Sequence, residues 1–276
     1  MRERAAAWMR ALHAGPLEEK DPNEHFAERK RLYELYLDTA GALIVHDSAE
    51  IIDKDMARTK VLGCAPDTPG DYLDLPDFSG SIKRESVRRV LRVYSTTNKT
   101  VGYVQGMNVL CALLYCVIDL EISSTFSESV TYFCFFNLMV DLGDLFSEKM
   151  DDSSVGARGQ ARKILCILKK QDKGLYAAVS KLNLFETTSF HLKWMFLMFS
   201  SEFSVPETLV LWDRFFLEAP KYQMLPYFSA ATLMLLRRSI IGQPSHQVFS
   251  TLQALSVSPA AALKKAEVLF QKDLHG

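Results

Sequence analysis

The chain has 276 residues, of which 48% are hydrophobic and 24% charged, and this balance excludes an intrinsically disordered chain. It carries 32 lysines and arginines against 33 aspartates and glutamates, so it lacks the basic excess that is typical of nucleic-acid-binding proteins. With only 13 glycines and 10 prolines, the composition favours a helical fold over a turn-rich β fold.

The sequence shows no segment that predicts export or membrane insertion. Residues 1–4 are Met-Arg-Glu-Arg and lack the apolar region of a signal peptide. The longest apolar runs, 109–118 and 130–140, are about half as long as a membrane-spanning helix, which needs about 20 residues. The cysteines are odd in number and three of the five lie in apolar runs, which favours buried thiols in a reducing compartment. We therefore expect a cytoplasmic protein without an anchor of its own.

Apolar residues recur at helical spacing along most of the chain and alternation with period two is almost absent, so the predicted fold class is all-α. Helices are expected over residues 3–12, 26–37, 49–59, 81–94, 105–120, 126–142, 161–180, 187–200, 206–217, 221–240 and 246–271. Two of them have start signals: Asp47 and Glu50 resemble a capping box before the third helix, and Ser204, Pro206 and Glu207 mark the start of the helix over 206–217.

Two polar segments interrupt the helical pattern. Residues 64–81 hold three prolines and two glycines, which predicts a long loop. Residues 151–160 are polar and rich in serine and glycine, which predicts a seam between two packed helical subdomains. The N-terminal subdomain is expected over about 1–155 and the C-terminal subdomain over about 156–276.

The chain lacks the short motifs of enzymes that bind phosphate, dinucleotides or zinc, and the motif of serine nucleophiles. Its six histidines are dispersed, and Cys111 and Cys116 lie in an apolar segment without further ligands, so we expect core thiols and no metal site. A self-contained catalytic site is therefore not predicted. Any contribution to chemistry is expected to be made in the active site of another protein.

The first segment that indicates function is the predicted helix end over residues 52–59. Asp55 and Arg58 are three residues apart and can pair on a helix, while Ile52 and Met56 can anchor its opposite face. This pattern presents an arginine that is held by a carboxylate near a helix end. Taken alone, the pattern is better explained by a surface ion pair, which contributes about 0–1 kcal/mol.

The second segment covers residues 102–108, between a polar stretch and a strongly apolar helix. Gly102 and Gly106 remove side chains on both sides of Gln105, so another backbone can approach closely. A glutamine at such a junction can orient a water molecule. The alternative is an ordinary helix N-terminus in which Gln105 and Asn108 act as polar caps.

Together the two segments resemble the TBC domain of Rab GTPase-activating proteins. The first motif of that family, I-x-x-D-x-x-R-T, is matched by Ile52, Asp55, Arg58 and Thr59. The second motif, Y-x-Q-G-M, is matched by Tyr103, Gln105, Gly106 and Met107. The segments around Trp8, Trp194 and Trp212 resemble further family helices, so the resemblance covers residues 4–240.

The resemblance implies a single TBC domain that is not itself a hydrolase and that activates a small GTPase of the Rab or Ras-like class. Arg58 would be a catalytic arginine finger held by Asp55, and Gln105 would be a second catalytic finger that orients the attacking water. Supporting or GTPase-binding roles fall to Thr59, Tyr103, Gly106, Met107 and Trp194, the last with its helix against the GTPase switch regions. Trp8 and Trp212 are expected in the core. No cofactor is expected, because GTP and Mg²⁺ are carried by the GTPase.

The sequence around the second motif, residues 101–110, is most similar to small fungal TBC proteins of the spindle-checkpoint and septation pathway. This implies a GTPase of the mitotic-exit network, an obligate partner protein, and a location at spindle poles or endomembranes through partners. A non-catalytic helical scaffold that binds a GTPase stays open as the alternative. Arg84, Arg88 and Arg92 recur every four residues and are expected to form either a solvated face or a surface that attracts an acidic partner.

Overall fold

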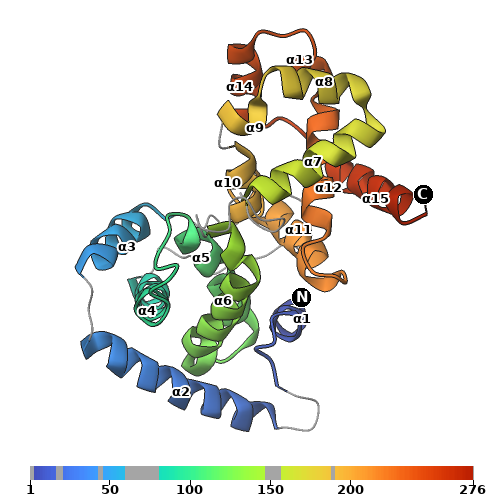
Figure 1. The fold of residues 1–276 in the computed structure, drawn as a ribbon. Coiled ribbons are helices and arrows are strands. Elements are labelled where there is room, and N and C mark those ends of the chain that lie inside the picture. Colours follow the sequence, from blue (N-terminus) through green and yellow to red (C-terminus); the bar gives the residue numbers. More distant parts are fainter. Residues whose placement is uncertain are drawn as a thin grey trace. The chain divides into compact units, whose positions relative to one another are not determined.

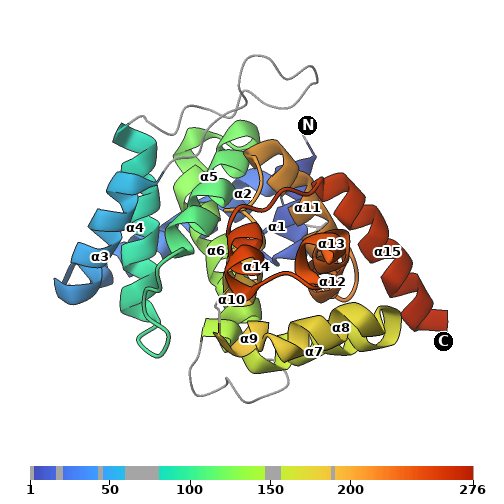
Figure 2. The same cartoon turned by 90° about the horizontal axis from the view of Figure 1, so that it is seen from above.

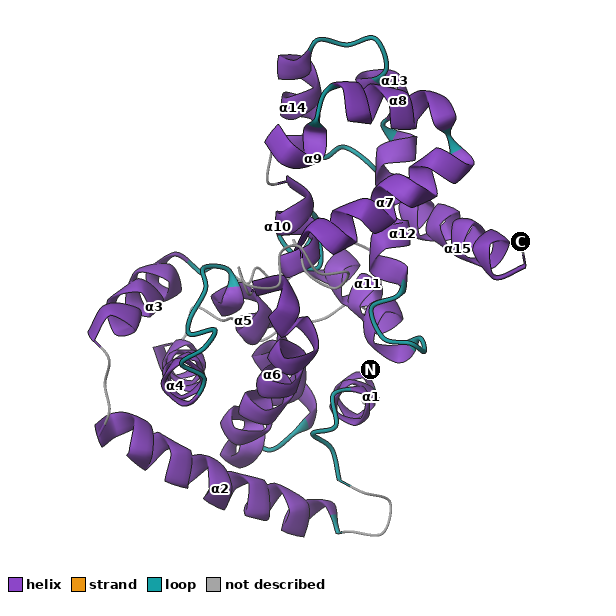
Figure 3. Ribbon diagram, in the orientation of Figure 1, coloured by secondary structure: helices purple, strands orange, loops and turns teal. Residues whose placement is uncertain are grey.

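The computed structural model describes residues 3–16, 21–42, 46–59, 81–146, 157–187 and 190–275. Every regular element in these ranges is a helix (Figure 3), which confirms the all-α prediction. Residues 64–80 of the predicted long loop lie outside the described ranges. The contacts within the chain divide it into two compact units, Met1–Gly143 and Asp144–Gly276, so the division falls before the expected boundary near residue 155.

Every helix that was predicted for the first half of the chain is present, with shifted ends. In chain order they are α1 (Arg4–Ala11), α2 (Pro22–Ala42), α3 (His46–Arg58), α4 (Ser81–Thr97), α5 (Met107–Glu121) and α6 (Ser124–Phe146). The predicted capping box at Asp47 is wrong, because α3 already begins at His46. Acidic residues are favoured both as caps and in the first turn of a helix, and the sequence does not separate these two positions.

Helix α5 is the buried centre of the N-terminal unit. All of its residues from Met107 to Ile118 are buried except Val109, and it contacts α1, α3 and α4. Trp8 of α1 is 1% exposed, which confirms its predicted core position. Cys116 and Cys134 are fully buried, as predicted, and burial raises the pKa of each thiol to about 12.

Aromatic side chains join α2, α4 and α6 around this centre. Tyr33 and Tyr36 of α2 pack against Tyr132 of α6, with ring centroids 5.2 and 5.8 Å apart. Tyr94 of α4 meets Phe135 of α6 edge-on at 5.1 Å. Helix α3 lies beside α4 in both ribbon views (Figures 1 and 2), so the two helices next to the motif segments are packed on one another.

Apart from α11, the helices in the second half of the chain are shorter than the sequence pattern predicted. They are α7 (Ala157–Gln171), α8 (Lys173–Lys181), α9 (Leu184–Thr187), α10 (Phe190–Phe196), α11 (Val205–Leu217), α12 (Met224–Leu235), α13 (Arg237–Ile240), α14 (Ser245–Gln253) and α15 (Pro259–His275). The single helix expected over 161–180 is broken by Asp172, whose carboxylate accepts the Leu175 N–H at 2.9 Å and caps α8. The expected helices over 221–240 and 246–271 are likewise each two helices. Apolar spacing continues across these breaks, so periodicity alone does not reveal them.

The starts of α7 and α11 in the C-terminal unit can be compared with the predicted helix starts. Residues 157–160 belong to α7 and not to the predicted polar loop, whose residues 151–156 lie outside the described ranges. The predicted start of α11 is confirmed, because Ser204 and Glu207 form a reciprocal capping box. Helix α12, buried over most of its length, contacts α7, α10, α11 and α15 and forms the centre of the C-terminal unit.

A buried turn follows α10 and depends on a tryptophan of α11. Met198 and Phe199 both have positive φ angles, 45° and 61°, and both are fully buried. The indole Nε1 of Trp212 donates a hydrogen bond to the Met198 carbonyl oxygen at 3.1 Å. Trp212 therefore lies in the core, as predicted, and also satisfies a carbonyl group that is shut off from water.

Replacing Trp212 by Phe removes this donor, so we expect the hydrogen-bond loss to lower the free energy of unfolding by about 1–3 kcal/mol beyond the packing loss. Trp194→Phe is the matched control, because the Trp194 indole is equally buried and its N–H finds no hydrogen-bond acceptor among the described residues. Urea unfolding of both variants measures the difference. Equal destabilisation would contradict the assigned role of the Trp212 hydrogen bond.

Candidate functional site

The two motif segments meet at the carboxylate of Asp55. Its Oδ1 accepts a hydrogen bond from Nη2 of Arg58 at 3.1 Å, and its Oδ2 accepts the hydroxyl proton of Tyr103 at 2.8 Å. Asp55 is only 5% exposed. A buried carboxylate is stable only when it is paired and hydrogen-bonded, so this contact joins the end of α3 to the loop before α5.

Arg58 is the last residue of α3 and points its charge outward. Its Nε donates to the Lys54 carbonyl oxygen at 3.2 Å, and its side chain is 72% exposed. A cation at the end of a helix is favoured by the helix dipole and by the free carbonyl groups there. No residue in the described ranges accepts a hydrogen bond from Nη1. The guanidinium is therefore held at one side and open at the other.

Tyr103 is held in its protonated form by its surroundings. Burial is the main cause that raises the pKa of its hydroxyl above the ordinary value, and the hydrogen bond to Asp55 raises that pKa further. The hydroxyl therefore remains a donor to the Asp55 carboxylate at neutral pH. Its oxygen also lies 3.1 Å from Oδ1 of Asn108, the residue that completes the site.

Asn108 closes the connection between the loop and α3, a role that sequence reasoning missed. Its Oδ1 accepts the Gly106 N–H at 3.1 Å, and its Nδ2 donates to the Thr59 hydroxyl at 2.7 Å. Thr59 in turn donates to the Asp55 carbonyl oxygen at 2.8 Å. The sequence signal that could have shown this role is the single amide side chain in the otherwise apolar stretch 107–114, because such a group needs hydrogen-bond partners when it is buried.

The loop around Gln105 is fixed by its backbone and by buried neighbours. Gly106 has a φ of 105°, a conformation that strains residues with a side chain, and it caps the start of α5. Met107 is fully buried, and its Sδ lies 3.3 Å from the Val104 nitrogen. Gln105, between Val104 and Gly106, is exposed. Within the described part of the chain no residue hydrogen-bonds to its side-chain amide. The amide is thus available to a partner.

Of the predicted site residues, all except Trp194 are brought together in the N-terminal unit. Trp194 belongs to the C-terminal unit and is 1% exposed. Its ring packs on Phe190 and Phe199, with centroids 4.8 and 4.9 Å away. The expectation that the Trp194 side chain touches a GTPase is therefore corrected: its indole is a core group, because the turn after α10 covers it.

The arginines of α4 do not form the expected open basic face. Arg88 and Arg92 both pair with Asp53 of α3, and Arg88 also pairs with Glu85. Carboxylates of the same chain thus neutralise these two arginines. The spacing of residues along a single helix cannot reveal this neutralisation, because Asp53 lies on another helix. The pairing leaves no face of free cations to attract an acidic partner at these two residues, although the Arg92 side chain stays 41% exposed, as a solvated face requires.

Other kinds of site are not supported in the described ranges. These ranges hold no group of three His, Cys, Asp or Glu residues that is placed to bind a metal ion. None of the described helices has both the length and the apolar character that a membrane crossing requires. A partly open cavity of about 210 Å³ lies among α2, α3 and α4, and no motif residue lines it; its lining is Leu37, Ala40, Gly41, Ala49, Arg89, Arg92, Val93, Ser95 and Thr96.

The fold and the site define a helical domain that exposes one arginine and one glutamine on neighbouring segments. Comparison with protein families identifies it further. The model of the Rab-GTPase-TBC domain family matches residues 1–241, and the chain therefore belongs to this family. This confirms the resemblance that the two motifs indicate.

Relatives in animals and fungi agree with this assignment. TBC1 domain family member 13 of Homo sapiens is 32% identical over 160 residues, which are 57% of this chain and 40% of that protein. A TBC domain-containing protein of Schizosaccharomyces pombe is 29% identical over 191 residues, 63% of this chain and 31% of that protein. The chain thus spans less than half the length of these relatives. Because they include a human protein, the narrower fungal subgroup stays a prediction.

A solved structure supports the fold. The crystal structure of the Ypt/Rab-GAP domain of Gyp1p superposes with a TM-score of 0.80 and covers 100% of this chain and 89% of that chain. The sequence identity is 17%, so this similarity concerns the fold.

Truncating Asn108 to alanine leaves the Gly106 N–H without its acceptor and removes the amide that donates to the Thr59 hydroxyl, which keeps its own hydrogen bond to the Asp55 carbonyl oxygen. We expect the free energy of unfolding of the N-terminal unit to fall by about 2–4 kcal/mol, because both groups lie in a buried network. Asn23→Ala, on the exposed first turn of α2, is the control and should change little. Urea unfolding measures both variants, and an equal small effect would show that the Asn108 contacts are dispensable.

Proposed function

We propose that this chain is a GTPase-activating protein for a small GTPase of the Rab class, and that it supplies Arg58 and Gln105 to the GTPase's nucleotide site. Membership in the Rab-GTPase-TBC domain family supports the class of partner. The observation that carries the proposal is the shared carboxylate of Asp55, which holds an exposed arginine next to the loop of an exposed glutamine.

In this proposal, Arg58 stabilises charge that develops during GTP hydrolysis. Negative charge builds on the phosphate oxygens in the transition state, and an arginine supplied by a partner protein accelerates Ras-type GTPases by about 10³–10⁵. The tether to Asp55 restricts the rotamers of Arg58 before the GTPase binds, so less side-chain entropy is lost in the complex. Nη1, which donates to no residue in the described part of the chain, remains to meet a phosphate oxygen.

Gln105 would act beside Arg58 by orienting the attacking water molecule. Its amide has both a donor and an acceptor, which is what a water molecule needs on two sides. Gly106 keeps the backbone next to Gln105 free of a side chain, and Asn108 fixes that backbone by accepting the Gly106 N–H. Geometry set in advance in this way is effective because it requires no rearrangement during the reaction.

The nucleotide and its Mg²⁺ belong to the GTPase in this scheme, and this chain carries no cofactor of its own. The bond that breaks is in the GTPase's substrate, so the chain acts as an activator and not as a hydrolase. A GTPase of the mitotic-exit or septation network, and an obligate second protein, are finer predictions that the same assay examines.

Single-turnover GTP hydrolysis by a panel of Rab and septation-type GTPases tests the proposal. We expect the wild-type chain to accelerate at least one of them, and Arg58→Ala and Gln105→Ala each to reduce that acceleration by about 10²-fold or more. Arg58→Lys should rescue little, because lysine lacks the planar fork of donors. Lys54→Gln is the matched control: it removes a cation on the same helix whose side chain is 70% exposed and pairs only with Glu50 in the described ranges.

Two outcomes would contradict this scheme. Full acceleration by Arg58→Ala would exclude the arginine finger. GTP-dependent binding without acceleration of any GTPase would favour the non-catalytic scaffold or a requirement for a second protein, and adding candidate partner proteins to the same assay separates these two.

A further inference from the structure

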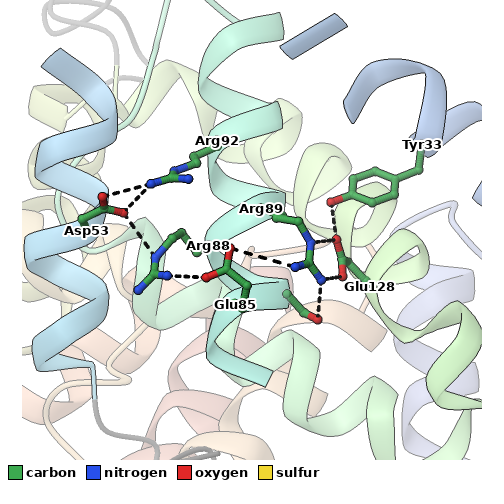
Figure 4. A network of polar contacts seen from close by, with 8 residues as sticks. Tyr33, Asp53, Glu85, Arg88, Arg89, Arg92 and Glu128 are labelled. Carbon is green, nitrogen blue, oxygen red and sulfur yellow. Dashed lines mark hydrogen bonds and ion pairs between the residues drawn. The ribbon is translucent and has the colours of Figure 1, made fainter. Parts of the chain in front are cut away.

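A second carboxylate of α3 faces away from the site and binds α4. Both oxygens of Asp53 lie 2.9 Å from Nη2 of Arg92, and Oδ1 lies 3.2 Å from Nε of Arg88. Figure 4 shows the two guanidinium groups reaching from α4 to the same carboxylate on α3. We call these three residues the Asp53 clamp. Asp53 occupies an unspecified position of the first motif, so the motif assigns it no role.

The clamp continues into a network that fixes the other side of α4. Arg88 also pairs with Glu85, and Arg89 donates from Nε to Glu128 of α6 at 2.8 Å (Figure 4). Glu128 also accepts the hydroxyl proton of Tyr33 of α2 at 2.8 Å. Helix α4 is therefore bonded to α3 on one side and to α6 and α2 on the other.

The clamp is better suited to fix a position than to stabilise the fold. The side chains of Asp53 and Arg92 are 46% and 41% exposed, and ion pairs this exposed contribute little to the free energy of unfolding. Their geometry is nevertheless specific, since the single carboxylate of Asp53 pairs with two arginines, Arg88 and Arg92, on neighbouring turns of α4. Without the Asp53 charge, Arg88 and Arg92 would be like charges four residues apart that repel one another.

Helix α4 leads directly into the loop of Gln105. The turn after α4 is closed by the Gly102 N–H, which donates to the Asn98 carbonyl oxygen at 2.7 Å. The clamp thus ties the helix that ends in Arg58 to the helix that precedes the Gln105 loop. On the opposite side, Asp55 joins α3 to the same loop through Tyr103.

We propose that the Asp53 clamp is a positioning device that sets α3, and with it Arg58, relative to the loop that carries Gln105. Asp53 touches neither substrate nor phosphate in this scheme and acts only through α3. The inference rests on the proposed function for its consequence in catalysis. Its structural part, the fixing of α3 on α4, does not need a GTPase to be tested.

Asp53→Asn keeps the size of the side chain and removes its charge. In hydrogen–deuterium exchange of the full chain we expect faster exchange in α3, with α5 and the C-terminal unit unchanged. In the GTPase assay, kcat at saturating activator should fall by roughly 10- to 100-fold through misplacement of Arg58, with the KM for the GTPase less affected. Glu50→Gln is the matched control, because it breaks a different ion pair of α3, the one with Lys54, and leaves both the contacts to α4 and the Asp55–Arg58 pair untouched.

The partner arginine provides the second variant. If the clamp acts as a unit, Asp53→Asn combined with Arg92→Gln should be no slower than Asp53→Asn alone, because both changes break the same contact. Independent, multiplying effects on kcat would contradict a shared role. Thermal unfolding of each variant shows that the protein is folded at the assay temperature.

The two readouts separate the possible failures. Unchanged exchange in α3 of Asp53→Asn overturns the clamp whatever the GTPase assay gives. Faster exchange with unchanged kcat overturns its role in positioning while Arg58→Ala still tests the proposed function. A wild-type chain that accelerates no GTPase refutes the proposed function and the catalytic role of the clamp together, and exchange then decides only whether Asp53 fixes α3.

Discussion

The buried carboxylate of Asp55 is the contact on which the candidate site depends. Removing a charge from water costs several kcal/mol unless donors replace the lost hydration. Asp55 receives one donor from Arg58 on its own helix and one from Tyr103 in a segment far along the chain. If the two segments separated, the Asp55 carboxylate would lose the Tyr103 donor and keep only Arg58. This loss costs free energy, so it keeps the two motifs together.

This arrangement explains how an exposed arginine and an exposed glutamine can have defined positions. Loops and helix ends are usually mobile, and only supporting contacts behind them fix the groups that they present. Behind Gln105 lie the fully buried Met107 and the amide of Asn108, and behind Arg58 lies Asp55. The nearly wholly buried α5 then connects these supports to the core of the N-terminal unit.

The sequence predicts the helices and the motif pairing well, because apolar spacing and residue types are local signals. It fails where a tertiary contact decides. Asp172 divides an expected helix by capping a new one, Trp194 is covered by a turn that its own helix pattern does not show, and Arg88 and Arg92 are neutralised by Asp53 of another helix. Asn108 was assigned only as a cap, since its partners lie on α3 and in the preceding loop. The motifs thus predict the exposed residues of the site, while the residues that hold them in place are set by tertiary contacts that the sequence pattern does not show.

The central claim is that Arg58 meets the transition state of GTP hydrolysis, and binding of a transition-state analogue tests it most directly. A GTPase loaded with GDP and aluminium fluoride mimics the transferring phosphoryl group. We expect the wild-type chain to bind this form at least about 10²-fold more tightly than the GDP form, and Arg58→Ala to lose this preference. Equal preference in the wild type and in Arg58→Ala would contradict it.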